Sequence, residues 1–421
     1  MPNSSIPVQS NLVDIGYLQV QTLSEENQFP IQDARVAISY TGQPDSVIET
    51  LETDSSGQTE TIALETPPLE YSETPGSPQP YSEYTLSITA PGFEPLTISG
   101  TEILPTANAI QVARLRPLRD AIGDSETVVI GPHTLYYQYP PKIAEAEVKP
   151  IRDTGSIVLN RVVVPEFIVV HDGVPTDNSV QNYYVPFRDY IKNVASSEIY
   201  ATWPRSTITA NVLAILSFTL NRVYTEWYRN QGYNFTITSS TAYDHKWIFE
   251  RNIYENISVI VDEIFNNYLS RPDVKQPILT QYCDGRNSQC PGWMTQWGSK
   301  ALGDQGYSPI EILRYYYGDD MYINTAEQIA GVPLSWPGSP LDIGSSGADV
   351  RVIQEQLNAI ASVYTAIPSL VPDGIFGENT QNSVRTFQSI FGLPQTGIVD
   401  FATWYRISAI YVAVTGIAEL S

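Results

Sequence analysis

The centre of the chain can be understood from one stretch, Val185-Pro-Phe-Arg-Asp-Tyr-Ile-Lys-Asn-Val-Ala-Ser-Ser-Glu198. Apolar side chains recur at helical spacing from Phe187 to Val194, and Pro186 suits the first turn of a helix. The pattern predicts a helix whose apolar face extends to Glu198 at its end. We expect a carboxyl group in that position to be partly buried, which raises its pKa and keeps part of it protonated.

The surrounding residues predict a helix-rich α+β domain over 151–335. Its expected elements are strands at 156–164 and 166–170, a long helix capped by Ser206 or Thr207, a helix near 247–269, and a helix over 310–317 opened by the capping box Ser308-Pro-Ile-Glu311. Upstream, paired prolines and scattered Gly and Asp predict that 119–150 is an irregular, exposed linker.

The two ends of the chain differ in composition from its centre. Residues 1–118 contain no Lys, three Arg and fifteen acidic residues, and their alternating apolar runs, separated by turns, predict an antiparallel all-β sandwich. Residues 341–421 predict three helices, at 348–361, 378–391 and 401–414. Two similar segments, Gly374-Ile-Phe-Gly and Gly397-Ile-Val-Asp, indicate two related half-units within this last domain.

Composition excludes several classes of protein. The formal net charge is −23, which repels nucleic acid and anionic membrane surfaces. No run of about 18 apolar residues predicts a membrane span, and the start from Met1 to Asp14 has no basic or apolar region of a secretory signal. Of the aromatic residues 27 are Tyr, whose flat face and hydroxyl group suit contact with sugars.

The C-terminal pattern resembles the peptidoglycan-binding domain of cell-wall hydrolases. The resemblance rests on Gly344-Ser-Ser-Gly-Ala-Asp-Val350, Asp373-Gly-Ile-Phe-Gly377 and Phe387-Gln388, together with Thr403-Trp404. It implies a three-helix fold that binds peptidoglycan. The N-terminal sandwich similarly resembles transthyretin-like modules.

The central domain resembles the SpoIID family of sporulation peptidoglycan enzymes through two ordered motifs. The first runs from Val185 to Pro204, and the second is Met294-Thr-Gln-Trp-Gly298 leading to Ile312-Leu-Arg-Tyr-Tyr316. The resemblance implies that Glu198 is the catalytic acid and that Thr295 and Gln296 reach the same cleft. Trp293 and Trp297 would stack on sugar rings, although a core indole is an equal alternative for each.

Cys283, Cys290 and His245 are the candidate metal ligands in the sequence. A disulfide between Cys283 and Cys290, or two free thiols, is favoured over metal, while a zinc site with His245 remains a weaker alternative. We expect no cofactor. His133 and His171 have no partner in the sequence that indicates catalysis.

The domain order, taken as a whole, resembles the clostridial spore cortex-lytic enzymes. It implies a lytic transglycosylase made as a zymogen, cut by an activating protease within 119–135, and located at the spore cortex or coat. Its partner would be cortex peptidoglycan. The alternatives are a non-catalytic SpoIID-like amidase enhancer, which acts by binding, and a muramoyl-alanine amidase with zinc.

Overall fold

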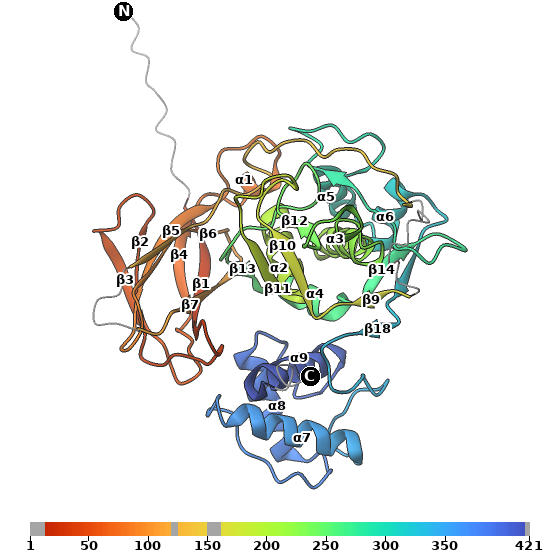
Figure 1. Ribbon diagram of the computed structural model, residues 1–421. Helices are drawn as coiled ribbons and strands as arrows, with labels where there is room; N and C mark the ends of the chain where they lie inside the picture. Colours follow the sequence, from red (N-terminus) through yellow and green to blue (C-terminus); the bar gives the residue numbers. More distant parts are fainter. Residues whose placement is uncertain (1–12, 119–124, 150–160, 417–421) are drawn as a thin grey trace, which may run out of the picture.

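The computed structural model describes residues 13–118, 125–149 and 161–416, and all structural statements concern this part of the chain. Figure 1 shows an N-terminal group of strands, a central α+β domain and a separate C-terminal group of three helices. Residues 1–12 of the expected β-sandwich, residues 119–124 and 150 of the predicted linker, and most of the expected strand at 156–164 lie outside the described residues.

The N-terminal β-domain, residues 13–118 with later strands added at its edges, contains two sheets. Their strands are β1 (Asp14–Ser24), β4 (Ile62–Thr66) and β7 (Asn108–Leu115) in one sheet, and β3 (Val47–Glu52), β2 (Arg35–Tyr40), β5 (Ser82–Thr89), β6 (Leu96–Ile103) and β8 (Glu126–Val129) in the other. Alternate side chains such as Leu18 and Val20 are buried, as a period of two requires. The prediction of a purely antiparallel fold is wrong, because β1 pairs with β7 and β6 pairs with β8 in parallel.

The expectation that the whole linker is exposed is also wrong. Residues 126–129 form β8 at the edge of a sheet, and His133 and Leu135 are buried. The following residues have no helix or regular strand, as predicted, but they pack on the central domain through backbone bonds such as Ile143 N–H to the Ala242 carbonyl, at 2.7 Å. Residues 130–149 therefore have no regular secondary structure, but their buried apolar side chains and their bonds to the central domain hold them in place.

The central domain is built around α3 (Arg205–Tyr224), which is buried on nearly every side. The helices around it are α2 (Phe187–Glu198), α4 (Glu255–Ile264), α5 (Gln296–Asp304) and α6 (Pro309–Tyr317). Short strands complete the domain, with β11 (Asn182–Pro186), β10 (Phe167–His171) and β12 (Ile237–Thr238) in one sheet and three pairs, β14 (Asn267–Ser270) with β17 (Tyr322–Thr325), β15 (Tyr282–Cys283) with β16 (Met294–Thr295), and β9 (Val163–Val164) with β18 (Gln328–Ile329).

The helix predictions in this domain have mixed outcomes. The helix ending at Glu198 and the capping box of α6 are confirmed. Helix α3 has Pro204 at its cap position, so the predicted caps Ser206 and Thr207 lie inside its first turn instead. The helix expected near 247–269 is shorter, because Glu250 has φ 54° and the chain then forms strand β13 (Ile253–Tyr254).

The C-terminal domain has the three predicted helices, α7 (Ala348–Ala361), α8 (Glu378–Ile390) and α9 (Phe401–Thr415). Its two half-units are confirmed by matching glutamines. The side-chain oxygen of Gln354 accepts the Gly374 N–H and that of Gln388 accepts the Gly397 N–H, both at 2.8 Å. Each amide then donates within the loop that it holds and to the helix that follows.

The C-terminal domain contacts the central domain at α2 and α4. Arg188 of α2 donates to the backbone carbonyl of Tyr405 in α9 at 3.1 Å. Arg188 and Lys192 both pair with the buried Asp262 of α4. Phe265, just beyond α4, packs edge-on against the ring of Tyr405, with 5.5 Å between ring centroids. Ion pairs therefore join α2 to α4, and the two helices meet α9 through the Arg188 bond and the packing of Phe265.

Candidate active site

Glu198 is the last residue of α2, and its side chain is held by two donors. The carboxylate accepts the backbone N–H of Lys246 at 2.6 Å and the hydroxyl group of Tyr282. Only 3% of the residue is exposed. The sequence places a glutamate at this buried helix end because the apolar face of α2 continues up to it.

The end of α2 is bound by residues from several parts of the chain. The amide of Gln296 donates to the Glu198 carbonyl at 2.9 Å, and Thr134 donates to the Ser197 carbonyl through both its N–H and its hydroxyl, each at 3.1 Å. The ring of His133 lies with Nε2 at 3.4 Å from the Ile199 carbonyl. Carbonyls that a helix end leaves free are thus satisfied, which fixes the position of Glu198.

Burial and nearby donors act in opposite directions on the proton affinity of Glu198. Burial raises the pKa of the Glu198 carboxyl group above its ordinary value, while the Lys142 ammonium group and the Lys246 N–H oppose the rise. Burial also lowers the pKa of Lys142 to about 8, against the attraction of Glu198. The carboxyl group therefore lies beside a cation that tunes its proton affinity.

Glu198 lies in the wall of a cleft. Its wall comes from the segment after β8, from the end of α2, and from the strand and loop that carry Cys283. The lining residues are Thr134, Tyr137, Tyr139, Pro140, Lys142, Glu198, Thr241, Tyr282, Cys283, Asp284, Asn287, Ser288 and Gln296. Tyrosine rings and polar loop atoms around a buried acid are suited to binding a saccharide.

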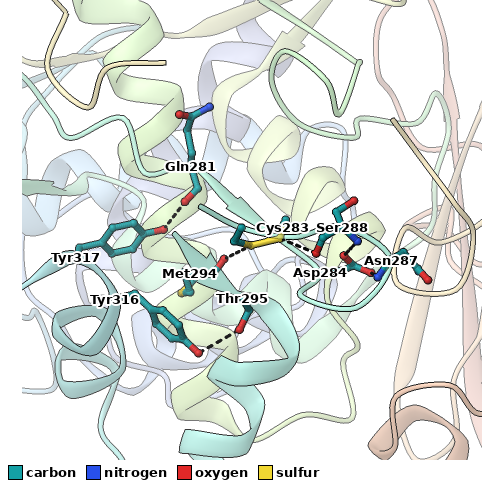
Figure 2. The surroundings of a disulfide bond; sticks show 10 residues. Gln281, Cys283, Asp284, Asn287, Ser288, Met294, Thr295, Tyr316 and Tyr317 are labelled. Atoms are coloured by element: carbon teal, nitrogen blue, oxygen red, sulfur yellow. Dashed lines mark hydrogen bonds between the residues drawn. A yellow bond between two sulfur atoms is a disulfide. The ribbon is translucent and has the colours of Figure 1, made fainter. Parts of the chain in front are cut away.

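A disulfide joins Cys283 to Cys290 (Figure 2) and closes a loop whose residues Cys283, Asp284, Asn287 and Ser288 line the cleft. Within the loop, Asp284 accepts the N–H groups of Asn287 and Ser288, at 2.7 and 2.8 Å. The disulfide alternative is therefore confirmed over free thiols, and the zinc interpretation is wrong because each sulfur is bonded to the other.

His245 lies among aromatic rings in the domain interior. Its Nδ1 is 3.1 Å from the hydroxyl of Tyr190, and its ring lies near those of Phe218 and Tyr282. Burial lowers the pKa of His245 well below its ordinary value, so the ring is neutral. Among the described residues, no three His, Cys, Asp or Glu side chains are arranged to hold a metal ion.

Only part of the second sequence motif lies at the cleft. Gln296 reaches the cleft, as predicted, whereas Thr295 bonds the hydroxyl of Tyr316 at 3.2 Å. Trp297 packs against Trp203, with 5.0 Å between ring centroids, and is a partly buried indole at the edge of the core. Trp293 lines a second hollow beyond the disulfide loop, together with Glu147, Arg271, Gly292 and Tyr316.

Sequence reasoning missed three residues that touch or tune Glu198. Tyr282 and Lys246 bond its carboxylate, and Lys142 supplies the nearby cation. They come from separate segments. Tyr282 directly precedes Cys283 and Lys246 directly follows His245, two candidate ligands of the sequence analysis, whereas Lys142 has no such neighbour.

Comparison with known proteins identifies one end of the chain. Residues 346–407 match the family described as putative peptidoglycan binding domain, so the chain carries a C-terminal peptidoglycan-binding domain. No curated protein matches the chain. A solved structure titled "The crystal structure of SleB N-terminal domain" shares 28% identity over 18% of this chain and 99% of that chain, with a TM-score of 0.17. None of the described helices is long and apolar enough to cross a membrane.

Proposed function

We propose that the chain is a peptidoglycan lytic transglycosylase that acts on the spore cortex, an enzyme of the same kind as the clostridial SleC. The observation that carries this proposal is a single buried glutamate at an open cleft, on a chain whose C-terminal domain belongs to a peptidoglycan-binding family. The two SpoIID-like motifs meet at this glutamate, since Gln296 of the second motif bonds the Glu198 carbonyl of the first.

The reaction needs one carboxyl group. Protonated Glu198 donates its proton to the glycosidic oxygen as the bond from that oxygen to C1 of muramic acid breaks. The C6 hydroxyl oxygen of the same sugar then bonds to C1, and the Glu198 carboxylate takes the hydroxyl proton, which restores the acid. The products are a shortened glycan and a 1,6-anhydromuramic end.

The surroundings of Glu198 support this chemistry over ordinary hydrolysis. Hydrolysis normally uses a second carboxylate to activate water or attack the sugar. Among the described residues that line the cleft, Asp284 is the other acid, and both of its oxygens accept backbone N–H groups of its own loop. Asp284 therefore shapes the loop, and Glu198 acts alone.

We further propose that the protein is a zymogen, cut by an activating protease and stored at the spore cortex or coat. A wall-degrading enzyme kept beside its substrate must be inactive until germination. The cleft wall in the described structure contains no residue of the N-terminal β-domain, which favours a folding role for that domain over direct blocking of the cleft.

The test is mass spectrometry of digested cortex with Glu198→Gln. The amide can accept the Lys246 N–H through its oxygen and donate to the Tyr282 hydroxyl, so the fold should persist. Loss of a general acid should lower the rate by about 10²–10⁴. Glu263→Gln, in an exposed pair with Arg205, is the matched control.

The products discriminate between the proposals. Anhydromuramic ends that disappear with Glu198→Gln support the transglycosylase. Reducing ends would indicate a hydrolase, and free alanine amino groups an amidase. A Glu198→Gln variant that keeps more than about a tenth of the wild-type activity would show that Glu198 is not the acid. Such an outcome is also expected if the protein acts only by binding peptidoglycan, as an amidase enhancer does.

A further inference from the structure

The N-terminal β-domain and the central domain share a buried polar contact. Glu102 of β6 is 1% exposed and Arg251 is 5% exposed. Their side chains form a two-pronged pair, with Arg251 Nη1 donating to Glu102 Oε1 at 2.8 Å and Nη2 donating to Oε2. Asn252 accepts the Glu102 N–H and donates to the Glu102 carbonyl, at 3.0 and 2.9 Å. A contact of this geometry is specific to these two surfaces.

Arg251 also reaches the helix that carries Glu198. Its Nη2 donates to the Ser196 carbonyl in the last turn of α2 at 3.2 Å, and its Nη1 donates to the Gly131 carbonyl at 3.1 Å. Tyr254 adds a second link, because its N–H donates to Ser196 Oγ and its hydroxyl donates to the Glu102 carbonyl, at 3.3 and 3.1 Å. Glu102 is therefore connected through one residue to the backbone two positions before Glu198.

Strand pairing joins the same two parts of the chain. β13 of the central domain adds to the edge of the first sheet beside β7, and β8, which follows the 119–124 segment, adds to the edge of the second sheet beside β6. In Figure 1, β13 lies between the N-terminal strands and α2. Each N-terminal sheet thus ends on a strand supplied by the later part of the chain.

A third contact comes from α1 (Glu70–Glu73), between β4 and β5. The Ser72 carbonyl accepts the Trp203 indole N–H at 2.9 Å, and Glu73 pairs with Lys300 at 2.7 Å. Trp203 in turn packs on Trp297 near the end of α2. The N-terminal β-domain therefore supports the central domain at three places around the helix end.

We propose that the N-terminal β-domain is a lasting part of the catalytic unit, in which Glu102 is a positioning residue that acts on Glu198 through Arg251. A cut within 119–124 then leaves the domain bound, because Glu102, β6 and β7 precede the cut while their partners Arg251, β8 and β13 follow it, and these contacts persist. This inference rests on the proposed role of Glu198, but its first test does not.

The first test is association of the cut chain. Residues 119–124 are replaced by the recognition sequence of a specific protease, the full chain is cut, and the fragments are applied to a size-exclusion column at micromolar concentration. Co-elution of the two fragments supports the proposal. Separate elution of folded fragments overturns it, and neither result depends on which reaction the protein catalyses.

The second test is Glu102→Gln in the full chain, with the exposed Glu60→Gln as matched control. We expect kcat for anhydromuropeptide release to fall at least tenfold while sacculus binding stays unchanged. We also expect the alkaline limb of the rate profile to move to higher pH, because a displaced Glu198 carboxyl group loses contact with the Lys142 ammonium group, the Lys246 N–H and the Tyr282 hydroxyl, which lower its pKa. Compared with Glu102→Gln, Glu102→Asp should restore part of kcat and part of the wild-type pH profile.

The outcomes separate the two proposals. A Glu102→Gln protein with wild-type kcat and pH profile overturns the positioning role. If that variant does not fold, association of the cut wild-type chain still decides whether the domain stays bound. If Glu198→Gln remains active, the proposed chemistry fails, whereas the association result stands on its own.

Discussion

The matching glutamines of the peptidoglycan-binding domain give a prediction whose size follows from their contacts. The amide of Gln354 donates to Asp373, to the Ile375 carbonyl and to Thr380, at 2.9–3.2 Å, and Gln388 repeats this pattern one half-unit later. Both residues are at most 1% exposed. We expect Gln354→Ala and Gln388→Ala to be equally destabilising, because each removes the partner of a buried glycine N–H.

The magnitude combines two effects. An unpaired buried donor costs about 1–3 kcal/mol, and the lost side-chain volume adds roughly 1 kcal/mol more. A total of about 2–4 kcal/mol lowers the midpoint of a domain this small by roughly 10–25 °C.

The assay is scanning calorimetry of the full chain, with the transition of this domain assigned by deleting 341–421. Sacculus pull-down above and below the new midpoint shows whether binding follows folding. Gln395 is exposed, so Gln395→Ala is the control and should change neither the unfolding midpoint nor the binding to sacculi. A shift below about 3 °C for Gln354→Ala or Gln388→Ala would refute the reasoning that these amides hold the two loops.

Three further predictions concern the catalytic part. Lys142→Met should move the alkaline limb of kcat/KM to higher pH, because removing the cation raises the pKa of Glu198, whereas the exposed Lys275→Met should leave the profile in place. Deleting 341–421 should weaken binding to insoluble peptidoglycan while cleavage of short soluble glycans is mostly retained, since a tethered module raises local concentration without entering the chemistry; unchanged pull-down would contradict this. Trp297→Ala should lower the melting temperature by several degrees through lost packing on Trp203, and a purely kinetic effect would show that the indole contacts substrate.

The sequence predicted those features that depend on local periodicity. The apolar spacing of α2 placed Glu198 at a buried helix end, and the repeated Gly segments indicated the half-units of the last domain. Pairing between distant strands has no such local signal. For this reason the parallel pairs and the addition of β13 to an N-terminal sheet were missed.

The catalytic surroundings show the same limit. Lys142, Lys246 and Tyr282 converge on one carboxyl group from three separate segments, and each is an ordinary residue in its own neighbourhood. A tryptophan within a sequence motif can either stack on a sugar ring or pack in the protein core, and the sequence does not distinguish the two. Trp297 lies against the core because Trp203 packs on it, a contact across more than ninety residues.

The contact between Arg188 and α9 has a consequence for how such chains diversify. The guanidinium donates to the main-chain oxygen of Tyr405, an acceptor that every residue type provides. Substitutions along α9 can therefore accumulate without removing this bond, provided that the helix keeps its path. A foreign wall-binding module grafted after Pro340 would keep this bond with any helix at this place, and it would need aromatic rings on that helix only where Phe401 and Tyr405 meet Phe265.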